Sequence, residues 1–151
     1  GLYAEDDNRF SQQVQAAGLD ESIVDVGWVE LEQLPAILST ADVGIYLMED
    51  TLLNRTKCPV KLADMLFSGV PVVAEAVGQV SVYVVHQQTG LLRVSGDVIG
   101  LVTDVVHLLR DKSAREQLSI VARQHIIDNF SWKRLSHLVE DAYTSGMSRL
   151  G

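Results

Sequence analysis

Two short, almost unbroken apolar runs constrain the fold of this chain more than any other feature. They occupy residues 43–48 and 70–74, and nearly every side chain in them is apolar. A strand with one face in water alternates apolar and polar residues, so unbroken runs predict strands that are buried on both faces, as in parallel sheets. Pro71 is tolerated because it stands near the start of the second run.

Helical patterns surround and separate these runs. The apolar spacing and the Pro and Gly positions predict helices at residues 4–18, 31–40, 59–68, 79–86, 97–110, 113–128 and 132–147. Weaker strand patterns occur at residues 23–28 and 91–94, and residues 49–58 read as a polar loop. Strands that alternate with helices predict an α/β fold with a Rossmann-like parallel sheet and flanking helices.

The number of strands is low for this fold class. The sequence shows two clear strand patterns and two weaker ones, whereas a complete doubly wound domain has about five or six strands. We therefore expect the first strand-helix-strand unit of the domain to precede Gly1.

Composition limits the classes of partner. The 151 residues suit one domain, and the net charge of −8 argues against nucleic acid, which requires a basic face. No apolar run approaches the length of a membrane span. A single cysteine, Cys58, cannot form an internal disulfide, so we expect a cytoplasmic setting.

Between residues 10 and 92, the positively charged side chains are confined to one place. Between residues 10 and 92, the only Lys or Arg residues are Arg55, Lys57 and Lys61, against ten acidic residues. A local cationic site in an acidic protein favours a small anionic ligand such as a phosphate. Ordinary solvated charge is the alternative that this spacing leaves open.

The cationic cluster falls where a predicted strand leads into a predicted helix. Ligands of open α/β sheets bind beyond the carboxyl ends of the strands. Pro59 suits the first helical position, and a free helix N-terminus attracts phosphate. Asp64, about one and a half turns into the helix, is placed to accept hydrogen bonds from a vicinal diol such as a ribose. The alternative is a plain helix start with an exposed acid.

Residues 59–74 read Pro-x-Lys-Leu-x-acid, then four residues, then Gly-x-Pro-Val-Val-Ala. This pattern resembles the group 1 (family 4) glycosyltransferases. Further matching motifs, in the expected order, are Gly27-Trp28-Val29, Ala41-Asp42-Val43-Gly44, Val77-Gly78, Thr89-Gly90-Leu91-Leu92 and Phe130-Ser131-Trp132. Several motifs in the correct order are more specific than any one of them.

The resemblance implies that residues 1–151 form a truncated C-terminal, nucleotide-sugar-binding domain of a two-domain GT-B enzyme. Such enzymes transfer a sugar from a nucleotide-diphosphate-sugar to an acceptor, usually with retention and without a bound metal or other cofactor. The implied partner is an N-terminal acceptor domain of the same protein, which would carry the catalytic residues and any peripheral contact with the inner face of the membrane. The isolated chain is expected to be inactive.

The resemblance also implies a set of donor-binding residues. The family carries two acids separated by seven residues; the second falls at Asp64, which would bind the ribose, and the first falls at Thr56. A neutral hydroxyl therefore replaces the acid that contacts the donor sugar. The full set of expected donor-binding residues is Val29 beside the base, Arg55, Thr56, Lys57, Val60, Lys61, Asp64 and Gly78.

Two other functions remain open at this stage. A non-catalytic binding module of GT-B type is favoured by Thr56, and a sugar-nucleotide epimerase shares the same two-domain architecture. The four histidines show no metal-ligand spacing, so no metal site is expected. Trp28 and Trp132 are interpreted as packing residues rather than as platforms for a sugar.

Overall fold

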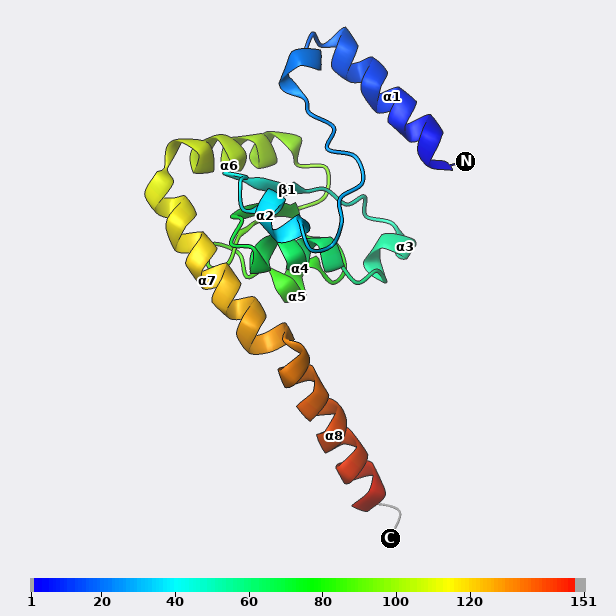
Figure 1. Cartoon of the computed structure of the whole chain (residues 1–151), viewed down its shortest axis with the longest axis vertical. Helices are drawn as coiled ribbons and strands as arrows, with labels where there is room; N and C mark the ends of the chain where they lie inside the picture. Colours follow the sequence, from blue (N-terminus) through cyan, green and yellow to red (C-terminus); the bar gives the residue numbers. More distant parts are fainter. Residues whose placement is uncertain (1, 149–151) are drawn as a thin grey trace. The chain divides into compact units, whose positions relative to one another are not determined.

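The structure is a computed structural model that describes residues 2–148, with the side chains of residues 9–147. The chain forms two units, Gly1–Leu31 and Glu32–Gly151 (Figure 1). The first unit contains helix α1, Leu2–Ala16, and the 3-10 helix η1, Asp20–Ser22. Gly18 follows α1 with a φ of +67°, which confirms the predicted helix end.

The strand predicted at residues 23–28 is wrong. These residues form no strand, and Val24 and Val26 are 83% and 57% exposed. Residues of high β-propensity have side chains that pack well on a half-buried sheet. A strand also requires an adjacent strand to which its backbone can hydrogen-bond. Among the described residues this segment has no such neighbour.

The second unit is built on a parallel sheet of three strands in the order β1-β2-β3. The strands are β1, Gly44–Tyr46, β2, Val72–Glu75, and β3, Leu91–Arg93. Ile45 lies opposite Val73, and Val73 lies opposite Leu91. The α/β class and the parallel sheet with flanking helices are therefore confirmed.

Helices connect and cover the strands. Between β1 and β2 lie α3, Leu52–Arg55, and α4, Val60–Phe67; α5, Val80–Tyr83, joins β2 to β3. The remaining helices are α2, Leu34–Leu38, α6, Val98–Arg110, α7, Lys112–Phe130, and α8, Trp132–Ser148. The prediction of a plain loop at residues 49–58 is wrong, because α3 lies inside it. The Thr51 hydroxyl accepts a hydrogen bond from the Asn54 N–H and so caps this short helix.

The alternation of side chains along β2 builds two cores. Val72 and Ala74 pack with Leu62 and Leu66 of α4 on one face of the sheet. Val73 packs on the other face with four leucines of β3, α6 and α7, which are Leu91, Leu101, Leu108 and Leu118. The strand β2 is buried on both faces, as its apolar run predicted.

The same prediction is wrong for β1. Ile45 and Leu47 are 49% and 64% exposed, although the run that contains them is as apolar as that of β2. Helix α6 packs over β2 and β3, and β1 lies at the edge of the sheet. The face of β1 that carries Ile45 is therefore left open within the described residues.

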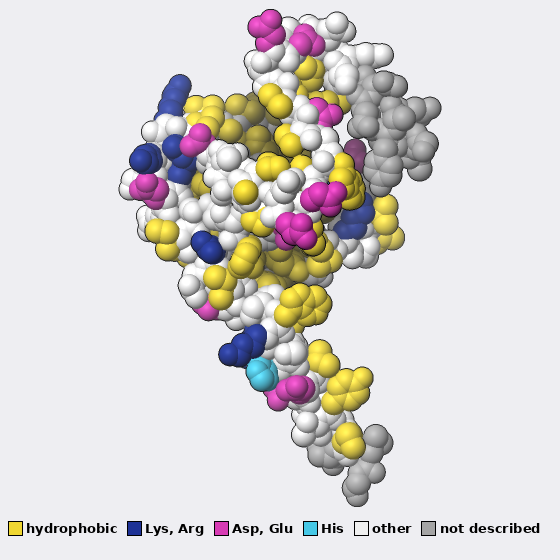
Figure 2. Space-filling model, in the orientation of Figure 1, with side chains coloured by type: hydrophobic (Ala, Val, Ile, Leu, Met, Phe, Trp, Pro, Cys, Tyr) yellow, Lys and Arg dark blue, Asp and Glu magenta, His cyan; other side chains and the backbone are white. Residues whose placement is uncertain are grey.

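Apolar side chains are also exposed along α8 (Figure 2). The sequence predicted that Trp28 and Trp132 are packing residues. Trp132 is 87% exposed and Trp28, in the first unit, is 92% exposed, so neither packs against the other described residues as predicted. None of the helices in residues 2–148 is both long and apolar enough to cross a membrane.

Candidate functional site

The three strands are parallel, so their carboxyl ends meet at one edge of the sheet. The chain leaves β1 there and returns as α4, whose first residue is Val60 and whose N-cap is Pro59. The predicted start of this helix at Pro59 is correct to within one residue. We refer to residues 49–64, which span this loop and the first turns of α4, as the β1–α4 junction.

Helix α4 divides its side chains between the core and the surface. Leu62 and Leu66 are fully buried against the sheet. Lys61 and Asp64 stand three residues apart, so they are neighbours on one flank of the helix. Lys61 is exposed and Asp64 is half-buried, and neither side chain has a partner within the described residues.

The positive end of the α4 dipole lies in the same place. Unpaired backbone N–H groups at a helix N-terminus carry partial positive charge and attract anions. The exposed Lys57 lies just before the helix and also has no side-chain partner in the part of the chain that the structure describes. The junction thus combines two unpaired ammonium groups with a helix N-terminus and one carboxylate.

Arg55 is different from the two lysines, because its charge is already paired. Its Nε lies 2.6 Å from Oδ1 of Asp50, and its Nη2 lies 2.8 Å from Oδ2 of the same carboxylate. This bidentate pair lowers the pKa of Asp50 through hydrogen bonding and raises that of Arg55. Both side chains are exposed, at 45% and 59%. Arg55 therefore contributes less free positive charge than the sequence alone suggests.

Thr56 and Gly78 both contact other parts of the chain. The Thr56 hydroxyl donates to the carbonyl of Leu53, 2.9 Å away, at the end of α3. Gly78 has a φ of +53°, and a Cβ atom there would lie 2.5 Å from the carbonyl oxygen of Arg55. The sequence predicted that Gly78 binds the donor; in the structure, its lack of a side chain lets the Arg55 backbone lie close to its own.

Two expected residues remain, Val60 and Val29, and they belong to different units of the chain. Val60 opens α4 and is 60% exposed. Val29 belongs to the unit Gly1–Leu31, whereas the other seven expected residues belong to Glu32–Gly151. The structure thus gathers Lys57, Val60, Lys61 and Asp64 around the start of α4.

Sequence reasoning missed two residues that hold the junction in place. The Cys58 thiol lies 3.3 Å from the Tyr83 hydroxyl of α5, and this hydrogen bond, with burial, raises the pKa of Tyr83 to about 12. Glu75, the last residue of β2, accepts hydrogen bonds from the backbone N–H groups of Met48 and Gly96. An acidic residue that directly follows a buried apolar run was the available signal for Glu75.

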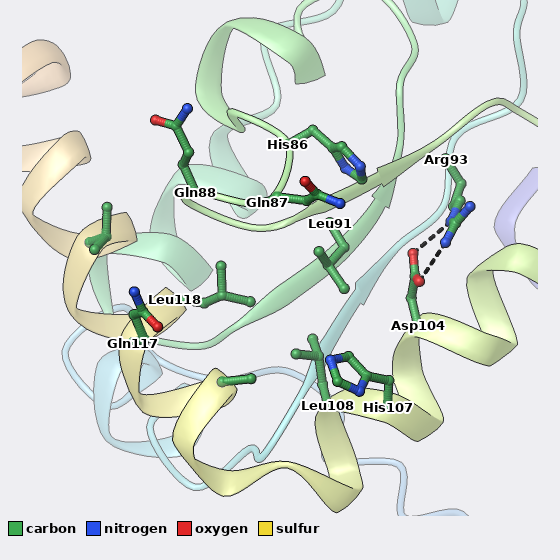
Figure 3. A pocket seen from close by; sticks show the side chains of 12 residues that line it. His86, Gln87, Gln88, Leu91, Arg93, Asp104, His107, Leu108, Gln117 and Leu118 are labelled. Carbon is green, nitrogen blue, oxygen red and sulfur yellow. Dashed lines mark hydrogen bonds and ion pairs between the residues drawn. The ribbon is translucent and has the colours of Figure 1, made fainter.

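A cavity lies elsewhere, beside β3 (Figure 3). This β3 cavity has a volume of about 580 Å³ and is bounded by β3, α6, α7 and residues 86–88. Its leucine floor belongs to the core on the α6 face of the sheet, opposite α4. The guanidinium of Arg93 holds both oxygens of Asp104 at 2.6 Å, so its charge is balanced. Size alone therefore does not make this cavity the anion site.

Residues 9–147 contain no group of three His, Cys, Asp or Glu side chains that could hold an ion.

Comparison with known proteins gives the family. The family model described as glycosyl transferases group 1 matches residues 3–111. The chain belongs to this family. It is similar to a D-inositol 3-phosphate glycosyltransferase of Corynebacterium diphtheriae, with 36% identity over 76 residues, which cover 50% of this chain and 18% of that protein.

Solved structures of other proteins share the fold. A sucrose-phosphate synthase of Thermosynechococcus elongatus has a TM-score of 0.77 and 23% identity, over 94% of this chain and 34% of the other. The Anabaena protein Alr3699/HepE, solved with UDP and glucose, has a TM-score of 0.79 and 18% identity, over 95% and 38%. The chain thus spans about a third of the length of these proteins. Their likeness shows the Rossmann-like fold of the GT-B type that the resemblance implied.

A shorter structure aligns more evenly in length. The C-terminal domain of a glycosyl transferase group 1 family protein from Francisella tularensis has a TM-score of 0.67 and 16% identity, over 85% of this chain and 64% of that one.

Proposed function

We infer that this chain supplies the donor-binding part of a glycosyl transferase that moves a sugar from a nucleotide-diphosphate-sugar to an acceptor with retention. The observation that carries the proposal is that Lys61 and Asp64 lie on one flank of α4, at the carboxyl edge of the sheet, and that neither has a partner among the described residues. Since the chain is a group 1 family member, we propose that this cation binds the diphosphate of the donor and this carboxylate its ribose. The Anabaena structure with UDP-glucose supports the ligand class.

The proposed roles follow from charge and reach. Lys57, Lys61 and the N–H groups at the start of α4 bind the diphosphate, and Asp64 accepts hydrogen bonds from the ribose hydroxyls. When the bond between the sugar and the diphosphate breaks, negative charge grows on the leaving group. Fixed positive charge at that position stabilises the transition state without having to reorganise.

The same proposal places the other parts of the reaction outside these residues. The acceptor site and the groups that assist the acceptor's attack would belong to an N-terminal domain of the same protein. A metal or cofactor is not required, because the lysines and the helix N-terminus supply the positive charge. Any peripheral membrane contact would come through that other domain, on the cytoplasmic side.

The test is calorimetric titration of the full-length protein with UDP-glucose, ADP-glucose and GDP-glucose, which differ only in the base. The parent should bind at least one of them, and Asp64→Ala should weaken that binding roughly tenfold by removing a charged hydrogen-bond acceptor. Asp141→Ala on α8 is the matched control and should bind like the parent. Equal binding by Asp64→Ala and the parent would show that the site is misassigned.

One observation favours a second function. Thr56 replaces an acid, and its hydroxyl is bonded to Leu53 rather than free for a sugar. A non-catalytic module that binds a nucleotide-sugar would tolerate this change. Assays of the full-length protein for release of the nucleoside diphosphate separate the two functions, because a binding module would bind the donor without consuming it.

A further inference from the structure

Glu75 occupies an unusual position at the end of the central strand. It is half-buried, and its two carboxylate oxygens bond to backbone on opposite sides. Oε2 accepts from the Met48 N–H at 2.7 Å, just after β1, and Oε1 accepts from the Gly96 N–H at 2.8 Å, just after β3. The Ser95 hydroxyl adds a 3.3 Å bond to the Met48 carbonyl. The carboxylate at the end of β2 therefore links the segment that follows β1 to the segment that follows β3.

These bonds determine where the β1–α4 junction begins. Met48 directly precedes Glu49, whose carbonyl accepts from the Asn54 side chain at 2.9 Å and so positions α3. Further along, the Arg55 backbone lies on Gly78, and Cys58 contacts Tyr83. The start, middle and end of the loop thus rest on Glu75, Gly78 and Tyr83, which all belong to the segment from β2 to α5.

We propose that Glu75 is a positioning residue for the donor site: its carboxylate fixes the exit of the chain from β1, and thereby fixes the loop that brings Lys57 and Lys61 to the diphosphate. The inference rests on the proposed donor-binding function. Only a carboxylate supplies both bonds, because a glutamine amide keeps one acceptor and turns an N–H₂ group toward the other backbone N–H. Hydrogen bonds to a charged group are also the stronger kind.

The experiment compares Glu75→Gln, Glu75→Asp and the parent, each as the full-length protein. Amide exchange of residues 49–58 should become roughly tenfold faster in Glu75→Gln, while exchange in α7 stays as in the parent. KM for UDP-glucose, or for whichever nucleotide-sugar the parent binds, should rise roughly tenfold with a smaller change in kcat, as expected for lost ground-state binding. Glu75→Asp, which keeps both acceptors at shorter reach, should restore part of both effects.

Glu116→Gln, which removes an exposed carboxylate of α7, is the control and should change neither readout. Unchanged exchange in residues 49–58 of Glu75→Gln would overturn the inference, as would equal acceleration throughout the protein, since that describes a purely structural role. If Glu75→Gln does not fold, Glu75→Asp is judged by the same two readouts. A parent that binds no nucleotide-sugar contradicts the proposed function, and the exchange comparison still decides whether Glu75 holds the loop.

Discussion

The β1–α4 junction and the β3 cavity both gather charged side chains beside the sheet, but they use them differently. In the β3 cavity, Asp104 is 7% exposed and binds Arg93 through two hydrogen bonds. In the junction, Lys57 and Lys61 are exposed and have no side-chain partner in the described part of the chain. Charges that satisfy each other stabilise the fold, whereas charges left in water remain available to a ligand. The β3 cavity is therefore the less suitable anion site.

Removal of Asp104 is expected to have the largest effect on the fold. Asp104→Ala leaves the guanidinium of Arg93 without the carboxylate that raises its pKa, and should lower the melting temperature by roughly 5 °C. Nucleotide-sugar binding should stay unchanged. Asp64→Ala is the comparison: it should weaken nucleotide-sugar binding and leave the melting temperature unchanged. A loss of donor affinity in a folded Asp104→Ala protein would contradict the separation of the two regions.

Lys61→Ala should have a smaller, purely functional effect. Loss of one ammonium group should weaken binding of pyrophosphate roughly fivefold, and the affinity should become less sensitive to salt. Lys112→Ala is a matched control, because Lys112 is an exposed lysine that pairs with Glu116 on α7. Calorimetry at two salt concentrations measures both properties. Identical salt dependence in Lys61→Ala and the parent would exclude Lys61 from the diphosphate site.

Arg55→Gln sharpens the comparison within the junction itself. Since Asp50 already balances Arg55, this change should weaken pyrophosphate binding by roughly twofold or less. The pKa of Asp50 should rise toward its ordinary value, which NMR titration of the carboxylate can follow. Folding lowers the pKa of Asp50. The Asp50–Arg55 pair therefore stabilises the fold at pH values above the ordinary pKa of a carboxylate, and this stabilisation is lost as pH falls through the lowered pKa. A larger effect than that of Lys61→Ala would show that Asp50 releases Arg55 to the ligand.

Cys58→Ala should have the smallest effect at neutral pH. It removes the hydrogen bond that, with burial, raises the pKa of Tyr83 to about 12, so that pKa should fall toward 10.0. A raised tyrosine pKa stabilises the fold below pH 10, and this contribution disappears as pH rises through about 12. Ultraviolet titration of tyrosinate measures the shift. An unchanged titration in Cys58→Ala would show that the thiol does not bind Tyr83.

Much of the fold could be predicted because it depends on local patterns. The apolar run before Glu75 predicted β2, and the long helices α6, α7 and α8 fall within a few residues of their expected ranges. The errors occur where burial depends on distant segments. The run that contains Ile45 is as apolar as β2, but its exposure depends on which strands α6 covers.

The sequence by itself determined the family pattern and the spacing of Lys61 and Asp64, because a helical repeat places residues three apart on one flank whatever surrounds them. Only the tertiary structure decided what the neighbouring side chains do. The bonds of Glu75 reach across 27 and 21 residues, and Gly78 meets Arg55 only after the strands have paired. Such contacts leave no periodic signal in the sequence, since they depend on the strand order that brings three chain segments to one edge of the sheet.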